Sequence, residues 1–262
     1  PHLNEDLGLA PALGPWLTGA FMLTMAVVIP VTGFLLQRFT TRQMFLAAMT
    51  LFSLGTLLAL IAPGFPTLLA GRIVQTSSTA ILMPLLMTTI MNVIPAHSRG
   101  RMMGRVGLVI SLAPALGPTL AGLVLDNLHW RWIFGLVLPI ALAALAIGAR
   151  WMLNLGETRR TPIDFISIPL AALGFGGLVF GLTQFGSEGE GSSSAVAGGV
   201  SLAVSLIALA LFVWRQLVLV REDRALLDLR VFQSRNYAVA VGLMTLIALA
   251  MFGTLTLLPL FL

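Results

Sequence analysis

Long runs of apolar residues, separated by short polar connections, make up most of this sequence. Each run is close to the roughly 20 residues that a helix needs to cross the hydrocarbon of a bilayer. Because backbone groups inside lipid must bond within their own helix, such runs indicate spanning α-helices. The pattern predicts an all-α fold, a polytopic transmembrane helical bundle with about eight spanning helices. They lie near residues 16–36, 43–62, 66–94, 103–125, 131–153, 162–185, 194–217 and 237–262.

Arginine marks one side of this expected bundle. All fifteen basic residues are arginine, and only Arg72 and Arg131 lie outside the odd-numbered connections and their flanks. The positive-inside rule places arginine-rich connections in the cytoplasm, so we expect a multi-pass protein whose odd-numbered connections are cytoplasmic. The arginines concerned are Arg38, Arg42, Arg99, Arg101, Arg105, Arg150, Arg159, Arg160, Arg215, Arg221, Arg224, Arg230 and Arg235.

The ends of the chain fit this orientation poorly if the chain is whole. Residue 1 would lie outside the cell without a preceding helix or signal sequence to carry it there. The last apolar run reaches Leu262 with no closing loop. We therefore expect an internal piece of a longer, transporter-like chain.

Composition excludes several other classes of protein. The chain is 58% hydrophobic and only 10% charged, whereas ordinary soluble domains are about 25% charged. Its net charge of +5 is scattered singly between apolar runs, so no basic groove for nucleic acid is expected. Cysteine is absent, and the three histidines fall in different connections. We therefore expect neither a metal site nor a cofactor.

Arg72 is the most informative single residue, because it lies about 10 Å inside the segment 66–94 at ~1.5 Å of helix rise per residue. An arginine at the bilayer centre costs at least ~2.5 kcal/mol, so one that persists usually faces a cavity or a partner. Gln75, Thr76 and Thr79 continue the same helix face. This polar stripe indicates the lining of a water-filled cavity. The alternative is an arginine that only hydrogen-bonds between helices.

A second unusual stretch, residues 108–122, combines prolines with small residues. Small residues four apart let helices approach backbone to backbone in lipid. We expect this helix to be buried among others and to pack closely against one of them, either as a functional contact or as a generic one. On a helix its residues form two adjacent rows, Ala113, Gly117 and Ala121 in one and Pro114, Pro118 and Gly122 in the other.

Three motifs resemble those of the major facilitator superfamily. Residues 33–42 resemble the loop signature between its second and third helices, Arg72-Ile73-Val74-Gln75 resembles its fourth-helix motif, and 114–122 resembles its antiporter motif. The whole chain is similar to the fourteen-helix drug/proton antiporters of the EmrB/QacA branch and, within it, to the lincomycin-resistance exporters. Departures occur at Gln37, Thr40 and Ala121, where the patterns usually have aspartate, glycine and glycine.

The resemblance implies a major facilitator fold and a domain division. Residues 1–154 would form helices 2–6 of the N-terminal bundle, with helix 1 absent. Residues 155–235 would form two intervening helices and a cytoplasmic linker, and 236–262 the first helix of the C-terminal bundle.

The resemblance also implies a function: proton-coupled efflux of amphiphilic or cationic drugs across the bacterial inner membrane by alternating access. The partners would be the lipid bilayer, the drug and protons, and we expect a monomer. Arg72 would take part in proton coupling. No carboxylate is predicted deep in the membrane, because Asp126 and Asp164 lie at predicted helix ends and Glu157 lies in a cytoplasmic connection. The resemblance therefore places the proton-carrying carboxylate in the absent first helix.

The loop motif consists of Gly33, Gln37, Arg38 and Arg42, which the resemblance gives the role of a conformational latch. Gln37 cannot form a charged pair, so an electrostatic latch there is weaker than the pattern implies. The alternative role of Arg38 and Arg42 is simple anchoring at the cytoplasmic surface.

Other functions remain open at this point. The chain could export an endogenous metabolite or a lipid, or it could be a membrane sensor that transports nothing. A membrane-embedded enzyme is not expected, because Ser77 and Ser78 have no histidine or carboxylate near them in the sequence.

Overall fold

The computed structural model describes residues 14–154, 166–186, 192–220 and 229–261, and within these ranges every regular element is helical. The first five helices are α2 (Gly14–Arg38), α3 (Thr41–Leu60), α4 (Phe65–Val93), α5 (Ala96–Asn127) and α6 (Arg131–Trp151). The sixth apolar segment consists of α7 (Ser167–Ala171), the π-helical turn η2 (Ala172–Gly176) and α8 (Gly177–Gly186). The chain continues as α9 (Ser192–Val220), the 3₁₀ turn η3 (Leu229–Gln233) and α10 (Arg235–Phe261).

All eight predicted segments are therefore helical where the structure describes them. In the described ranges, six helices are long and apolar enough to cross a membrane, and two shorter apolar helices cover Ser167–Leu182 and Arg235–Ala250. One boundary was wrong: α5 begins at Ala96 rather than near residue 103. Hydropathy locates the part of a helix that lies in hydrocarbon, whereas backbone hydrogen bonding continues into the polar turns beyond it.

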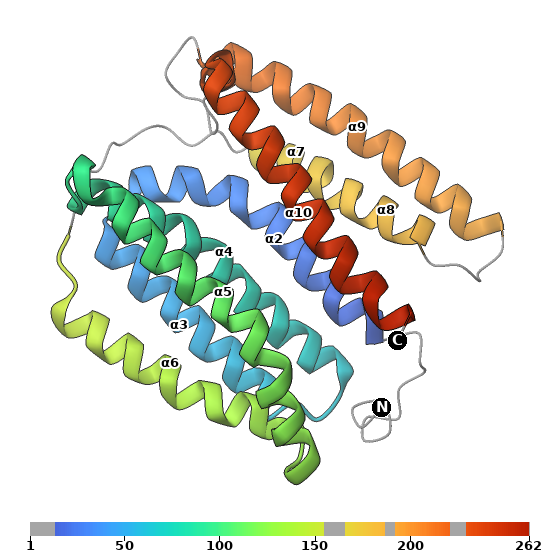
Figure 1. Ribbon diagram of the computed structural model, residues 1–262. Coiled ribbons are helices and arrows are strands. Elements are labelled where there is room, and N and C mark those ends of the chain that lie inside the picture. Colours follow the sequence, from blue (N-terminus) through green and yellow to red (C-terminus); the bar gives the residue numbers. More distant parts are fainter. Residues whose placement is uncertain (1–13, 155–165, 187–191, 221–228, 262) are drawn as a thin grey trace.

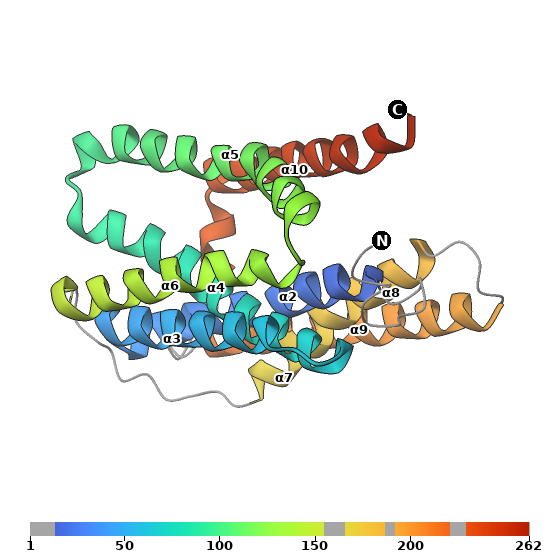
Figure 2. The ribbon, with the colours of Figure 1, turned by 90° about the horizontal axis from the view of Figure 1, so that it is seen from below.

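The long helices lie in two layers (Figures 1 and 2). α3 packs between α4 and α6, α4 also packs on α2, and the unit α7–η2–α8 lies between α2 and α9. These helices, from α2 to α4 and from α6 to α9, form the first layer. Figure 2 shows α5 and α10 on one side of it. Neither α5 nor α10 has a buried side chain among its described residues, so the packed core belongs to the first layer.

Helices α3 and α4 cross backbone to backbone at two glycines. A Cβ on Gly55 would lie 2.5 Å from the backbone N of Gln75 and 2.7 Å from the carbonyl O of Gly71. A Cβ on Gly71 would lie 2.9 Å from the backbone N of Ala59. Since these neighbours are backbone atoms, only glycine allows the two helices to cross at this distance.

Arginine side chains close the carbonyl ends of several helices. Arg42 at the start of α3 donates to Ala149 O near the end of α6 (2.7 Å), and Arg131 at the start of α6 donates to Ala62 O just beyond α3 (2.8 Å). The antiparallel pair α3–α6 is thus joined by an arginine at each end. The last carbonyls of a helix have no hydrogen-bond donor within the helix and carry partial negative charge. An arginine side chain supplies both a donor and a positive charge. Arg99 donates similarly to Met91 O and Ile94 O at the end of α4, and Arg230 to Val220 O at the end of α9.

Candidate functional site

A directed chain of hydrogen bonds links α4 to α3 within the membrane-spanning part of both helices. Arg72 Nη1 donates to Gln75 Oε1 (2.9 Å), and Gln75 Nε2 donates to Thr56 Oγ1 (2.9 Å). Thr56 Oγ1 in turn donates to Phe52 O one turn earlier on α3 (2.7 Å). Thr56 is fully buried, Gln75 is 8% exposed, and Arg72 is only partly buried. The guanidinium therefore stands at the accessible end of a buried polar network.

The structure places the predicted stripe partly inside the α3–α4 interface. Thr76 is buried and donates to Arg72 O (2.7 Å), while the partly buried Thr79 donates to Gln75 O (3.2 Å). Both threonines thus satisfy their hydroxyl protons on their own helix. The two members that remain accessible to a cavity are Arg72 and Thr79, because Gln75 and Thr76 are buried.

The predicted antiporter-motif helix is α5, and it stands apart from the packed layer. A Cβ on Gly117 or Gly122 would meet nothing within 4 Å, and Pro118 is exposed. The side chain of Pro114 lies outside what the structure describes. The small residues therefore face no partner within the described ranges, whereas we expected this helix to be buried among others.

Fewer residues of the loop motif bond to other helices than the motif implies. Gly33 lies within α2, and Gln37 and Arg38 are exposed in its last turn. Thr40 caps α3 by accepting from the backbone N of Gln43, whose side chain accepts from the backbone N of Thr40 in return. Arg42 alone reaches another part of the bundle, through its bond to α6.

Sequence reasoning missed Thr56, Gly55 and Gly71. A glycine followed by a threonine inside an apolar helix is the signal that could have drawn attention to α3. Only the pairing of α3 with α4, which is non-local, shows that this threonine meets Gln75.

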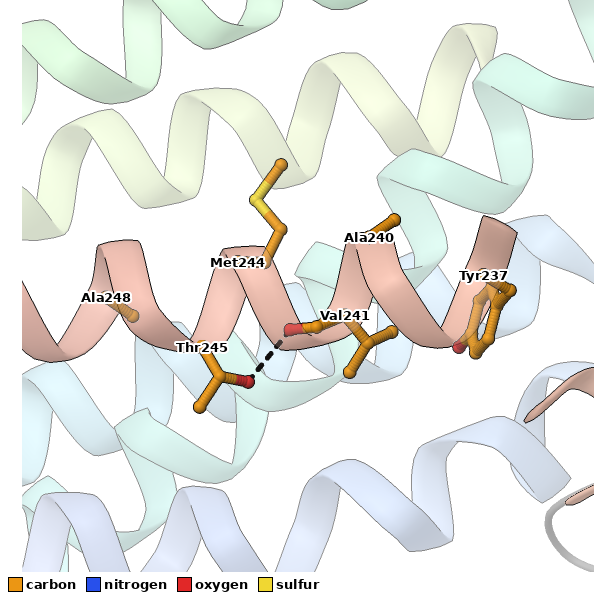
Figure 3. A pocket seen from close by; sticks show the side chains of 6 residues that line it. All are labelled: Tyr237, Ala240, Val241, Met244, Thr245 and Ala248. Carbon is orange, nitrogen blue, oxygen red and sulfur yellow. Dashed lines mark hydrogen bonds between the residues drawn. The ribbon is translucent and has the colours of Figure 1, made fainter. Parts of the chain in front are cut away.

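A shallow hollow of about 430 Å³ lies along α10 (Figure 3). Its lining residues are Tyr237, Ala240, Val241, Met244, Thr245 and Ala248, which all belong to one face of this helix. Thr245 donates to Val241 O (2.9 Å), so its hydroxyl proton is already used. A hollow with one wall needs a second surface before it can enclose a ligand.

Metal-binding chemistry has no support in the described ranges, where no three His, Cys, Asp or Glu side chains gather. The single carboxylate in those ranges belongs to Asp126, which is exposed near the end of α5. Glu157 and Asp164 lie outside the described residues, as do the other acidic residues.

Comparison with known proteins gives the family. The profile of the Major Facilitator Superfamily matches residues 1–262. The uncharacterized MFS-type transporter YcnB of Bacillus subtilis is 41% identical over 261 residues, 100% of this chain and 54% of that protein. The lincomycin resistance protein LmrB of Listeria monocytogenes is 42% identical over 260 residues, 99% of this chain and 54% of that protein. The multidrug export protein EmrB of Haemophilus influenzae is 32% identical over 267 residues, 100% of this chain and 51% of that protein.

The chain therefore belongs to the major facilitator superfamily, and it spans about half the length of these relatives. This confirms the resemblance drawn from the three motifs and the prediction of an all-α polytopic bundle. It also identifies the chain as part of a multi-pass membrane protein of a transporter family.

Proposed function

We propose that the chain is part of an exporter that exchanges amphiphilic or cationic drugs for protons across the bacterial inner membrane. The observation that carries this proposal is the partly buried Arg72, which lies inside α4 and donates to the neutral side chain of Gln75. The names of two relatives, a lincomycin resistance protein and a multidrug export protein, support drugs as the cargo.

An arginine with no carboxylate partner among the described residues suits proton coupling for an electrostatic reason. A carboxylate approaching Arg72 would be favoured in its ionised form, since opposite charges attract strongly where water is scarce. When the carboxylate takes up a proton, that attraction is lost and the two groups can separate. Arg72 thus links the protonation of another residue to a rearrangement of helices. We expect the carboxylate outside the described residues, in a helix that precedes α2 in the whole protein.

Alternating access requires two bundles that rock about a central site. We propose that residues 1–154 belong to one bundle and 236–262 to the other, joined through 155–235. The intervening unit α7–η2–α8 packs on α2, which supports its attachment to the first bundle. The odd-numbered connections would be cytoplasmic, and labelling that placed Arg99 and Arg160 on opposite faces of the membrane would contradict this orientation.

Within this scheme α5 seals the pathway. Its open row of small residues would pack against a helix of the second bundle, with Gly117 at the contact. A Gly117→Leu variant of the full-length protein should then transport less and leak more protons. Unchanged transport and leak would rule out the sealing role.

The proposed function is tested by expressing the full-length gene in an efflux-deficient host. Growth in ethidium and in lincomycin is compared for the native protein, for Arg72→Lys, and for an empty vector. The native protein should raise resistance, an uncoupler should abolish ethidium export, and Arg72→Lys should lose most of the effect at equal membrane abundance. Resistance that survives the uncoupler would refute proton coupling, and the absence of any resistance would refute drug export.

A further inference from the structure

Thr56 contributes a fully buried hydroxyl to the network, although it touches neither Arg72 nor any open space. Its one proton is donated to Phe52 O at 2.7 Å. The oxygen that faces Gln75 can therefore only accept a hydrogen bond.

Together with the guanidinium of Arg72, which can only donate, this restriction determines which way round the Gln75 side chain lies. A glutamine amide has a donor end and an acceptor end of nearly the same shape. With Nε2 donating to Thr56, Oε1 is directed at Arg72 Nη1, 2.9 Å away. In the reverse orientation two donors would face each other at Arg72, and an oxygen would face an oxygen at Thr56. Both contacts, one buried and one partly buried, would then be lost, at a cost greater than that of one ordinary hydrogen bond.

The glycine crossing makes this contact possible. Gly55 precedes Thr56, and a Cβ on it would lie 2.5 Å from the backbone N of Gln75. The two helices are thus close enough for a threonine on one to reach the amide of a glutamine on the other.

We propose that Thr56 is a positioning residue for proton coupling, which sets the orientation of the Gln75 amide and thereby holds Arg72 through a neutral acceptor. The proposal rests on the proposed function. A neutral acceptor fixes the guanidinium in place without cancelling its charge, which stays available to an approaching carboxylate.

The test compares variants of the full-length transporter in inverted membrane vesicles, with ethidium as the probe. Thr56→Val keeps the side-chain shape but removes the acceptor. It should lower the maximal uncoupler-sensitive rate about tenfold, the scale of one buried hydrogen bond, with little change in the half-saturating ethidium concentration. It should also shift the pH dependence of transport, and Thr56→Ser should restore the native behaviour.

Thr32 supplies a matched control. It is also fully buried and also donates to a carbonyl one turn back, Val28 O at 2.9 Å. Thr32→Val should change neither the rate nor its pH dependence. If Thr56→Val fails to reach the membrane, Thr56→Ala is compared with Thr32→Ala in its place.

A double variant separates positioning from general packing. If Thr56 acts through Gln75, Thr56→Val should add nothing to the defect of Gln75→Leu. If the rate losses of Thr56→Val and Gln75→Leu multiply in the double variant, the role of Thr56 is overturned. The same holds if Thr56→Val transports within twofold of the native rate while Arg72→Lys is impaired. Neither outcome would overturn the proposed function itself. If the native protein itself shows no uncoupler-sensitive ethidium export, the proposed function fails and this inference falls with it.

Discussion

Helices α3 and α5 contain similar apolar sequence but lie in opposite surroundings. α3 packs against both α4 and α6, and residues such as Ala48, Thr56 and Ala59 are completely covered. In α5, Leu108 is 74% exposed and no described side chain is buried. The comparison shows that hydropathy locates a spanning helix without indicating whether or where it packs.

The glycines of the two regions make the same point. A Cβ on Gly55 or Gly71 would overlap the backbone of the facing helix, whereas a Cβ on Gly117 or Gly122 would meet nothing within 4 Å. Lipid removes most of the hydrophobic drive for helix association, so close backbone contact and interhelical hydrogen bonds must supply it. α3 has both, through its glycine crossing and through the bond from Gln75 to Thr56.

The largest effect is expected for Gly55→Ala. Its new methyl group would overlap backbone atoms of α4, which cannot move aside as a side chain can. We expect the full-length protein to lose about 2–3 kcal/mol of stability or more, measured as thermal unfolding in detergent. Gly19→Ala is the control, because a Cβ there meets nothing within 4 Å. Equal unfolding temperatures for the two variants would contradict the close crossing.

A smaller effect is expected for Gly148→Ala on α6. Its Cβ would overlap the ring of Phe45 on α3, which is a side chain and can shift. We expect a loss of about 1–2 kcal/mol in the same unfolding measurement. Phe45→Leu should relieve the overlap, so the double variant should be more stable than the two separate losses predict. Strictly additive losses would show that these residues do not meet.

Removing the arginines that join α3 and α6 should cost less. Arg131→Gln loses a bond to Ala62 O and the stacking of its guanidinium on Trp130, 4.7 Å from the ring centre. We expect about 1 kcal/mol for this partly buried residue and less for Arg42→Gln, because Arg42 is exposed to screening. Raising the salt concentration should weaken the Arg42 contribution first. A larger loss for Arg42→Gln than for Arg131→Gln would reverse this ranking.

The smallest effect is expected on α5. Gly104→Ala adds a methyl group in open space, and alanine favours helix by about 0.5–1 kcal/mol over glycine. The full-length protein should be unchanged or slightly more stable. A loss as large as that of Gly55→Ala would mean that α5 is packed in the whole protein as tightly as α3 is here.

The arginines illustrate how far the sequence could be interpreted. The presence of Arg38, Arg42 and Arg99 in odd-numbered connections predicted the orientation across the membrane, and Arg131 was an exception to that pattern. The structure shows that Arg42, Arg99 and Arg131 share one physical task, because each donates to carbonyls at the end of a helix. The carbonyl that each reaches could not be predicted, since Arg42 and Ala149 lie 107 residues apart.

The sequence alone determined where the apolar helices lie, the all-α membrane class and the family. In hydrocarbon a backbone must bond within its own helix, so a sufficiently long apolar run leaves no other structure. The tertiary structure alone decided that Gln75 turns toward Thr56, that Gly55 meets Gly71, and that α5 leaves the layer in which α3 is enclosed. These features depend on which helix faces which, and the interactions that decide this join residues far apart in the chain.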